Sequence, residues 1–429
     1  MITKRSERNN YILLLENDTM TDFFTMDDFD FAGKKVLLRV DINAPIDPST
    51  GHILDDTRMR RILPTLAELE DSAVAILAHQ SRPGKKDFTD MGKHAERLSH
   101  LTGREVEYID DLFGSRAMSA IEGMEPGDII LLENTRFYSE EVSLKGKPAD
   151  VQESTHIVSN LHPLFDYYIN DAFAAAHRAQ PTLIGFAKKI PSVAGRLMEK
   201  ELVGLGKALH GKRPIIAVLG GAKFDDSIDI AANMLENNIA DRVLTSGAVA
   251  NLFILASGRR LGKPSEDFLN ENGNSDALLK KAEELIEKYP EKLVLPHDLA
   301  VDYRGKREDI GLDELPLDYP ILDIGFQTIA SYVWEIRDAG TVILNGPAGV
   351  FEREEFALGT REIFMAVANS KGYGVIGGGH STAMVSQLGI ERKIDHISTG
   401  GGAAINFLAG RKMPAVEALR QSKEHFRKG

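Results

Sequence analysis

The chain of 429 residues contains no cysteine. This absence excludes disulfide bonds, thiolate metal sites and cysteine nucleophiles. No stretch approaches the ~20 consecutive apolar residues that a membrane-spanning helix needs. The chain also lacks an excess of positive charge, because 51 Lys and Arg stand against 64 Asp and Glu, a net charge of −13. We therefore expect no nucleic-acid or membrane partner, and an anion site would have to be a local basic cluster.

The first 22 residues are predicted to form a disordered extension. Basic residues there precede an apolar patch, but Tyr11–Leu15 is shorter than the roughly 7–15-residue core of a secretion signal. Met20 is a candidate for an alternative translation start. A chain without cysteine suits a reducing compartment, so we expect a cytoplasmic protein. We expect a monomer, with a homodimer as the alternative.

The stretch from Pro191 to Lys223 is predicted to connect two α/β domains. Apolar residues from Val193 to Leu209 recur at three- and four-residue steps, which is typical of an amphipathic helix. A buried strand, Ile215–Leu219, then leads into a glycine turn that can present backbone N–H groups and Lys223 to a phosphate. The expected organisation is an extension at 1–22, a first domain at 23–190, a connecting helix at 191–209, a second domain at 210–410 and a C-terminal segment at 411–429.

Strand-like and helix-like runs alternate along the first half, which predicts a parallel sheet. The expected strands are Val36–Val40, Val74–Ala78, Val106–Ile109, Ile129–Leu132 and Tyr167–Asn170. The expected helices are Arg58–Leu69, Lys93–Leu101, Ser115–Ile121 and Ala149–Asn160.

Polar residues follow several of these strands, at the edge where open parallel sheets bind ligands. Five arginines are candidates to converge there on one pocket, and guanidinium groups match carboxylate and phosphate geometry. The expected ligand is a small, multiply anionic molecule. His79 and His177 are either part of that pocket or hydrogen-bonded structural groups, and neither has a serine or cysteine nucleophile beside it. The arginines are Arg39, Arg58, Arg82, Arg136 and Arg178.

The second half continues the alternation. Arg259–Asn274 is polar and turn-rich and is expected to be a surface excursion, and Lys306–Pro320 is expected to be a loop. The expected helices are Asp229–Glu236, Val249–Ser257, Ala277–Lys288 and Thr328–Arg337, and the expected strands are Arg242–Thr245, Lys292–Pro296 and Ile321–Gly325.

Three further strands end in glycine-bearing turns, in Thr341–Glu352, Tyr373–Val385 and His396–Leu408. A helix expected near Ser381 begins behind the second turn, and Ser381 is a candidate to cap it. Helix starts behind glycines offer free N–H donors, so several of them together predict a polyphosphate site. None of the turns matches the Walker or dinucleotide pattern. Glu352 is either a ribose ligand or a solvated loop residue.

The ordered motifs RVDINAP, HQSR, LLENTRF, NDAFAAAHRA, LGGAK, LNGPAGVFE, GGGHSTA and STGGGAA resemble phosphoglycerate kinase, and in detail its archaeal branch. The resemblance runs from about Phe23 to the C-terminal helix. It implies two Rossmann-like domains, each a parallel sheet flanked by helices, joined by a hinge helix, with the C-terminal segment packed back on the first domain. It also implies reversible phosphoryl transfer between ATP and 3-phosphoglycerate, which gives ADP and 1,3-bisphosphoglycerate.

The resemblance also assigns roles to individual residues. Arg58, Lys223, Gly400 and Gly401 would be catalytic, with Arg58 stabilising the transferring group and the two glycines facing the transition state. The phosphoglycerate site would comprise Asp41, Ile42, Asn43, Arg58, His79, Gln80, Ser81, Arg82, Arg136 and Arg178. The nucleotide site would comprise Lys223, Glu352, Gly378, Gly379, His380 and Ser381.

Two positions depart from the common family pattern. His380 stands where many members have an acidic residue that helps to hold Mg²⁺, and Ser227 stands where many have a second lysine. A neutral imidazole is a poor ligand for this hard cation. We therefore expect Mg²⁺ to accompany ATP or ADP and to be held mostly by phosphates and water. No metal ligand is assigned, and Asp225 or Asp226 is an outer-sphere candidate.

Phosphoryl transfer needs positioning and charge neutralisation rather than a protein nucleophile, which suits this set of residues. Two alternatives differ in class. One is a nicotinamide-dependent dehydrogenase with a Rossmann half, and the other is a catalytically silent nucleotide- or metabolite-binding protein.

Overall fold

The computed structural model describes residues 22–427, apart from the side chain of His380. The predicted extension therefore lies almost wholly outside the described residues. The chain divides into two compact units. The first unit comprises the described residues up to Leu202 together with those from Lys412 onward, and the second unit is Val203–Arg411.

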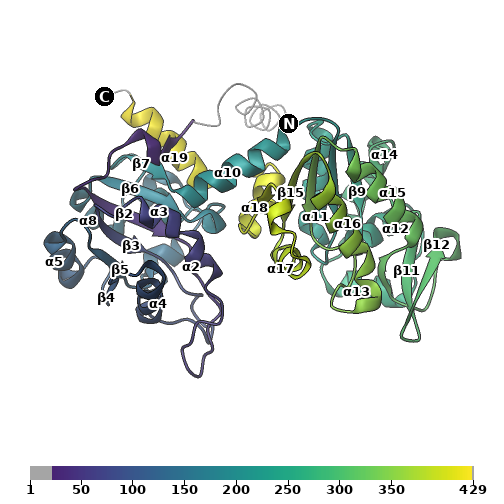
Figure 1. Cartoon of the computed structure of the whole chain (residues 1–429), viewed down its shortest axis with the longest axis horizontal. Coiled ribbons are helices and arrows are strands. Elements are labelled where there is room, and N and C mark those ends of the chain that lie inside the picture. The colour runs from purple at the N-terminus through teal and green to yellow at the C-terminus, as the bar shows by residue number, and fades with distance from the viewer. Residues whose placement is uncertain (1–21, 428–429) are drawn as a thin grey trace. The chain divides into compact units, whose positions relative to one another are not determined.

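The first unit is built on a sheet of seven strands in the order β1-β7-β6-β2-β3-β5-β4 (Figure 1). Every neighbouring pair in it is parallel, so the predicted parallel sheet is confirmed. The strands are β1 (Phe24–Thr25), β2 (Lys35–Val40), β3 (Ala73–Leu77), β4 (Glu107–Ile109), β5 (Ile129–Leu132), β6 (Tyr167–Asp171) and β7 (Ser192–Ala194).

Helices cover both faces of this sheet because alternate residues of each strand point to opposite sides. Leu38 of β2 packs in a core with α2 to α4, whereas Leu37 packs in a separate core with α5 and α8. The helices are α2 (Thr57–Arg61), α3 (Leu63–Ala67), α4 (Gly92–Thr102), α5 (Ser115–Gly123), α6 (Ser139–Ser143), α7 (Ala149–Glu153), α8 (His156–Leu161) and α9 (Pro181–Ile184).

Two helices expected to be continuous are each broken in two. The run expected at Arg58–Leu69 divides at Ile62, because Pro64 lies in the first turn of α3 and cannot donate the hydrogen bond that a continuous helix requires. The run expected at Ala149–Asn160 divides at Ser154–Thr155, where Thr155 has extended backbone.

The second unit contains a parallel sheet of six strands in the order β10-β9-β8-β14-β15-β16. Its core joins Val218, Leu344 and Ile376 of the central strands to α15, α16 and α17. The strands are β8 (Ile215–Leu219), β9 (Arg242–Thr245), β10 (Leu293–Val294), β14 (Thr341–Asn345), β15 (Tyr373–Gly377) and β16 (His396–Ile397).

The helices of this unit flank the sheet as Figure 1 shows, with α11 and α12 packed against β8 and β9. No helix within residues 22–427 combines the length and apolarity that crossing a membrane requires. The helices are α11 (Phe224–Glu236), α12 (Gly247–Ala256), α13 (Lys263–Glu271), α14 (Asp276–Lys288), α15 (Phe326–Arg337), α16 (Leu358–Asn369), α17 (Gly379–Leu388) and α18 (Gly402–Leu408).

Two expectations for the second unit are wrong. The expected loop at Lys306–Pro320 contains a strand, β12 (Lys306–Gly311), which pairs antiparallel with β11 (Asp298–Tyr303) across a turn of Arg304 and Gly305. Both turn residues have positive φ, as a two-residue hairpin requires. With β13 (Ile321–Ile324), these strands form a separate three-stranded sheet. Pairing with β11, rather than its own charged sequence, makes β12 a strand.

The expected surface excursion at Arg259–Asn274 contains the helix α13. Pro264 occupies its first turn, where the missing N–H costs nothing. The Glu266 carboxylate accepts hydrogen bonds from the backbone N–H groups of Leu261 (2.9 Å) and Gly262 (3.3 Å), which fixes the start of the helix.

The long helix α10 (Arg196–Leu209) contains the point at which the two units divide. It begins later than the sequence suggested, because Ser192–Ala194 pairs with β6 as β7. The Asp171 carboxylate, at the end of β6, accepts hydrogen bonds from the N–H groups of Leu197 (2.8 Å) and Met198 (3.0 Å). The Thr65 hydroxyl donates to its other oxygen (2.7 Å). Asp171 thus ties the start of α10 to the central sheet.

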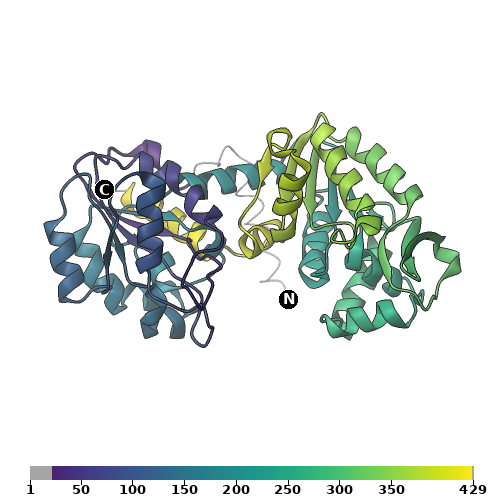
Figure 2. The same ribbon diagram turned by 60° about the horizontal axis from the view of Figure 1, so that its bottom comes forward.

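The C-terminal helix α19 (Pro414–Phe426) packs on β1, β7 and α9 of the first unit. In Figures 1 and 2 it is the yellow helix that lies against the strands of that unit. The Lys423 ammonium donates to the Phe23 carbonyl (2.9 Å), and the Ser422 hydroxyl accepts from the Ser192 N–H (2.8 Å). These contacts join the two ends of the described chain.

Asp171 makes the stability of the first unit depend on pH. Burial raises the pKa of Asp171 from 3.8 to about 6, although Thr65, Met198 and Leu197 donate hydrogen bonds to it. Between pH 4 and 6 the folded state therefore holds a proton that the unfolded state has released, so stability falls as pH rises. Raising the pKa of Asp171 from 3.8 to about 6 corresponds to a loss of ~3 kcal/mol in the free energy of unfolding as the pH rises through this range.

Asp171→Asn should remove that dependence, because the amide oxygen still accepts both N–H groups but carries no charge. We expect urea unfolding of the variant to gain up to ~3 kcal/mol over the parent at pH 7.5 and little at pH 4.5. Parallel stability curves for the two proteins from pH 4 to 8 would contradict the assignment.

Candidate functional site

The first unit gathers its predicted site residues at one edge of the sheet. Strand β2 lies between β3 and β6, with Arg39 beside Leu77 on one side and Asn170 on the other. The loops that follow these three parallel strands therefore leave the sheet together. The strand order also reverses between β2 and β6, and such a switch point is where open α/β sheets bind ligands.

Asp41 is a buried carboxylate at this edge. Its Oδ1 accepts hydrogen bonds from Arg58 Nη1 (2.8 Å) and from the Asn43 N–H (3.1 Å). Burial raises the pKa of Asp41, but His79, Arg58 and Arg39 outweigh burial and lower this pKa to about 2. Asp41 is therefore ionised at neutral pH and holds the half-exposed Arg58 side chain at the edge.

A second chain of contacts links three of the predicted residues. The Asn43 side-chain oxygen accepts from the Ser81 N–H (2.6 Å), and the Ser81 carbonyl accepts from Arg136 Nη1. Ser81 has a φ of +55°, which is uncommon outside glycine. Its Oγ donates to Asp87 Oδ1 (2.6 Å), which supports this conformation. The loop after β3 is thus shaped to bring Ser81 and Arg136 beside Asn43.

Positive charges crowd at this edge. Burial lowers the pKa of Arg136 to about 10, and the charges of Arg178 and Arg39 add to that effect. Burial also lowers the pKa of Arg178, with Arg39 and Arg58 contributing in the same direction and Asp41 opposing them. The guanidinium groups remain protonated at neutral pH, so they repel one another. A bound polyanion would relieve this repulsion.

Arg39 differs from the other arginines of the predicted cluster. It is 1% exposed. Its Nε donates to Thr182 Oγ1 (3.0 Å), which in turn donates to the buried Glu141 carboxylate (2.6 Å). The expectation that five arginines share one pocket is therefore wrong for Arg39. Its side chain is buried and bonded to Thr182, so its role is structural.

His79 is buried and its ring Nδ1 lies 3.0 Å from Arg39 Nη2. Because arginine is only a donor, Nδ1 accepts and the proton of the neutral ring is on Nε2. Burial and the charges of Arg39, Arg136 and Arg178 lower the pKa of His79 well below 6.5, although Asp41 opposes them. His79 is therefore a hydrogen-bonded structural group, and its part in a ligand pocket stays a prediction.

The remaining predicted residues of the first unit differ in their placement. Ile42 is fully buried in the core. The Gln80 amide forms hydrogen bonds with the backbone of Ala44 and with the ring of His94, so the Gln80 side chain has a structural role. Arg82 is exposed and lies outside the hydrogen-bond chains described above. Burial lowers the pKa of His177 to about 4, and its Nε2 accepts from Arg178 Nε (3.2 Å).

In the second unit, glycine turns meet at the ends of β8, β14 and β15. Asn345, the last residue of β14, lies beside Leu219 of β8 and Gly377 of β15. The strand order reverses between β8 and β14, so this edge is also a switch point. A Cβ on Gly220 would lie 2.3 Å from the Pro347 carbonyl oxygen, so only glycine lets these two turns touch.

Two buried polar atoms lack partners beside the third turn. Within the described part of the chain, Ser381 Oγ and Asn345 Oδ1 are both buried without a hydrogen bond, and both lie within 3.5 Å of the Cβ position of Gly378. Gly378 has a φ of +98° and precedes the first residue of α17. The helix thus begins at Gly379, and the expectation that Ser381 caps it is wrong. Unsatisfied buried atoms at a helix start indicate a ligand site.

The other predicted nucleotide residues lie along the same unit. Lys223 is exposed and directly precedes α11, and Gly400 and Gly401 directly precede α18, behind β16. Because β16 pairs with β15 in parallel, the turn of Gly400 and Gly401 follows the strand next to the one that ends at the Gly378 turn. The side chain of His380 lies outside the described residues.

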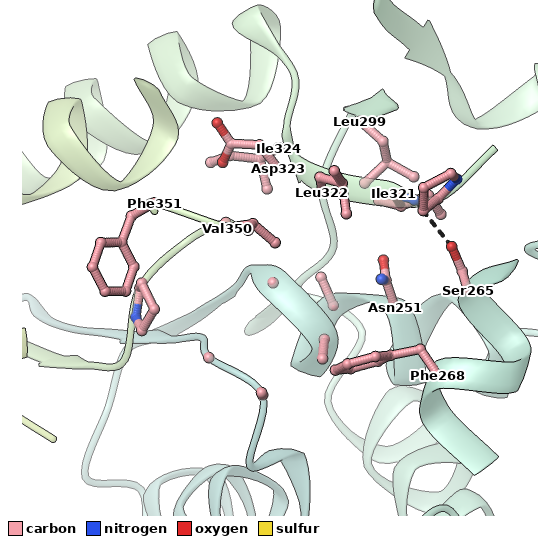
Figure 3. A pocket seen from close by; sticks show the side chains of 18 of the residues that line it. Asn251, Ser265, Phe268, Leu299, Ile321, Leu322, Asp323, Ile324, Val350 and Phe351 are labelled. Carbon is pink, nitrogen blue, oxygen red and sulfur yellow. Dashed lines mark hydrogen bonds between the residues drawn. The ribbon is translucent and has the colours of Figure 1, made fainter. Parts of the chain in front are cut away.

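A cavity of about 280 Å³ extends from these turns. Glu352 and Gly221 line it, together with residues that the sequence had not singled out. In Figure 3, Asn251 and Phe268 lie on one side of the hollow, and Leu322 and Val350 lie across from them. The signal that was missed is a fifth glycine junction, Ser246–Gly247 after β9, which brings α12 to this edge.

Comparison with known proteins gives consistent matches. Residues 26–411 match the family model described as phosphoglycerate kinase. The chain is 52% identical over 408 residues to a phosphoglycerate kinase of Methanothermus fervidus, which covers 94% of this chain and 98% of that protein. The chain belongs to the phosphoglycerate kinase family.

Solved structures of the family agree with this assignment. The phosphoglycerate kinase of Pyrococcus horikoshii matches with a TM-score of 0.85 and 44% identity, covering 94% of this chain and 100% of that one. The enzyme of Coxiella burnetii matches with a TM-score of 0.79 and 32% identity over 93% of this chain and 99% of that one. The chain is therefore an ATP-dependent phosphotransferase with the glycolytic activity of phosphoglycerate kinase, and the dehydrogenase alternative is not supported.

Proposed function

We propose that the first unit binds 3-phosphoglycerate or 1,3-bisphosphoglycerate and that the second unit binds ATP or ADP. The observation that carries this proposal is the crowding of Arg58, Arg136 and Arg178 around Asp41, which suits a ligand with several negative charges. Asn43, His79 and Arg82 complete the proposed substrate site.

The proposed roles in the second unit follow the order of groups in a nucleotide. Lys223 and the turn from Gly378 to Ser381 hold the phosphates, where unpartnered Ser381 Oγ is available as a donor. Glu352, at the mouth of the cavity, holds the ribose. Gly400 and Gly401 present the N–H groups at the start of α18 to the transferring phosphoryl group.

The proposed reaction is a direct in-line transfer. The carboxylate of 3-phosphoglycerate is already ionised at neutral pH, so it attacks the γ-phosphorus without a general base, and the bond to the ADP oxygen breaks. The protein's part is to align the two anions and to neutralise the charge of the transition state. Arg58 takes the second role, because Asp41 fixes one end of its guanidinium group while the side chain remains 42% exposed.

We propose that Mg²⁺ enters this site bound to the nucleotide and is not held by protein ligands alone. Within residues 22–427, no group of three or more histidine, aspartate or glutamate residues is placed to hold a metal ion. Asp226 is paired with Arg411 (3.3 Å), whereas Asp225 is exposed in the first turn of α11. We propose that phosphate oxygens and water hold Mg²⁺ and that Asp225 is the outer-sphere carboxylate. Bound there, Mg²⁺ would neutralise phosphate charge.

Because the two proposed sites belong to different units, we propose that the units close on one another for the reaction, with α10 as the hinge. One chain then carries both half-sites, and we propose that it acts as a monomer. A cytoplasmic location completes the proposal, since a cysteine-free chain requires no oxidising compartment.

The test is to incubate the protein with ATP, Mg²⁺, 3-phosphoglycerate and hydroxylamine, which traps an acyl phosphate as the hydroxamate with release of phosphate and so draws the unfavourable transfer forward. We expect ADP, followed by ³¹P NMR, and the hydroxamate to appear in equal amounts, and we expect EDTA to stop the reaction. Binding of both ligands without formation of an acyl phosphate would contradict the proposal and would favour the silent binding protein.

A further inference from the structure

Asn251 is a buried polar side chain that the reaction described above does not use. It lies on α12, is 5% exposed and lines the cavity of the second unit. Its Oδ1 is buried and has no hydrogen-bond partner among the residues that the structure describes. An unpaired buried carbonyl of this kind is unfavourable unless a ligand satisfies it.

The other polar side chains that line the cavity already form hydrogen bonds within the protein or lie at the mouth of the cavity. Ser265 Oγ accepts from the Ile321 N–H (3.0 Å), as the dashed line in Figure 3 marks. Asp323 Oδ2 accepts from Arg307 Nη1 and from the Gly359 N–H, both at 2.8 Å. Asp323 Oδ1 is also buried without a partner among the described residues, but it lies against the backbone of Gly349 and Gly359, 2.6 Å and 2.3 Å from their Cβ positions. Glu352 is exposed. Among the described lining residues, Asn251 is therefore the uncharged side chain that still needs a partner from a ligand.

The position of Asn251 predicts which part of a bound nucleotide it would contact. A Cβ on Gly247 would lie 3.0 Å from the Gly221 N, so the start of α12 adjoins the phosphate turn. Asn251 lies one helical turn further on, roughly 6 Å along the axis. Pro264 and Phe268 line the cavity beyond it. Phosphates at Gly221 and a ribose at Glu352 would thus bring the base to Asn251.

The surroundings of Asn251 suit a flat aromatic base. Phe268 is 41% exposed, which is unusual for a phenylalanine that lines a cavity, and Leu322 and Val350 lie across from it in Figure 3. The same figure shows the Asn251 amide directed from α12 toward Ile321 and Leu322, at the edge of the space between these apolar side chains. A base stacked on Phe268 would present its edge to this amide.

We infer that Asn251 Oδ1 accepts a hydrogen bond from the 6-amino group of adenine, and that Asn251 makes the protein prefer adenine nucleotides to purine nucleotides without that amine. A carboxamide matches adenine because it pairs an acceptor with the amine and a donor with a neighbouring ring nitrogen. The inference rests on nucleotide binding by the second unit, as proposed above. It adds a specificity-determining residue.

The experiment compares ATP with purine riboside triphosphate, which has hydrogen in place of the 6-amino group. For the unmodified protein we expect kcat/KM for ATP to be at least tenfold higher, because the analogue leaves Asn251 unpaired. In Asn251→Leu, which keeps the size of the side chain, we expect the ratio to fall to about one. Because each ratio is measured within one protein, a partly unfolded variant does not affect it.

Ser265→Ala is the matched control, since it removes a neighbouring polar group that already has a partner. We expect it to change both kcat/KM values by the same factor and to leave their ratio unchanged. A ratio near one in the unmodified protein, or an unchanged ratio in Asn251→Leu, would overturn the inference while leaving the kinase function intact. No turnover with either nucleotide would instead count against the proposed function.

Discussion

Replacing Arg58 by alanine should lower kcat about a thousandfold while leaving the Kd for ATP within about twofold, the size of effect seen for arginines that neutralise phosphoryl transition states. Arg58 Nη1 is held 2.8 Å from Asp41 Oδ1, so the guanidinium group is fixed in place before substrate arrives. Nucleotide binding is assigned to the other unit, and the substitution should not disturb it. Stopped-flow turnover and calorimetric titration with ATP measure the two quantities separately.

Arg60→Ala is the control for this prediction. Arg60 lies on the same short helix, is 57% exposed and pairs with Asp56 (2.8 Å) on the surface. Its loss should change stability little and leave kcat unchanged, because exposed ion pairs are screened by solvent. If Arg58→Ala retained kcat within tenfold, or if Arg60→Ala lost as much activity, Arg58 would not be the group that stabilises the transfer.

Replacing Gly378 by alanine should weaken ATP binding about 10- to 100-fold, with a structural cost of ~1–3 kcal/mol from a backbone conformation that only glycine adopts readily. The new methyl group would lie 3.2 Å from Ser381 Oγ and 3.5 Å from Asn345 Oδ1. Ser381 Oγ is the unpartnered donor assigned to the nucleotide phosphates, and Asn345 Oδ1 is an acceptor beside it. Titration calorimetry gives the affinity, and thermal unfolding gives the stability.

Gly389→Ala separates strain from binding. Gly389 ends the same helix with a φ of +65°, and a Cβ there meets nothing within 4 Å. The substitution should lower stability by about 1 kcal/mol and leave the Kd for ATP unchanged. Equal losses of affinity in the two variants would show that helix stability, and not contact with the phosphates, explains the effect at Gly378.

The sequence predicted best those features that depend on local pattern. Buried strands such as Val36–Val40 and Ile129–Leu132 were found because β-rich apolar runs bounded by polar turns are readable one segment at a time. The convergence of Asp41, Arg58 and Arg136 followed from the rule that loops after neighbouring parallel strands meet at one edge.

Features that depend on long-range contacts could not be predicted from the sequence. Arg39 has the same residue type and strand-end position as a ligand-binding arginine, and only its bond to Thr182, 143 residues away, reveals a structural role. The strand Lys306–Gly311 is polar enough to be a loop and is ordered by pairing with Asp298–Tyr303. Phe268 and Asn251 line the cavity because α12 packs beside β13 and α13 packs on α12, which no local pattern encodes.

The central claim is that two half-sites on separate units meet when both substrates are bound. The absence of native cysteine allows one dye to be placed on each unit, through Glu122→Cys and Glu287→Cys at exposed positions. We predict that energy transfer between the dyes changes when 3-phosphoglycerate and a non-hydrolysable ATP analogue are added together, and changes less with either alone. Unchanged energy transfer at saturation with both ligands, in labelled protein that still turns over, would contradict the claim.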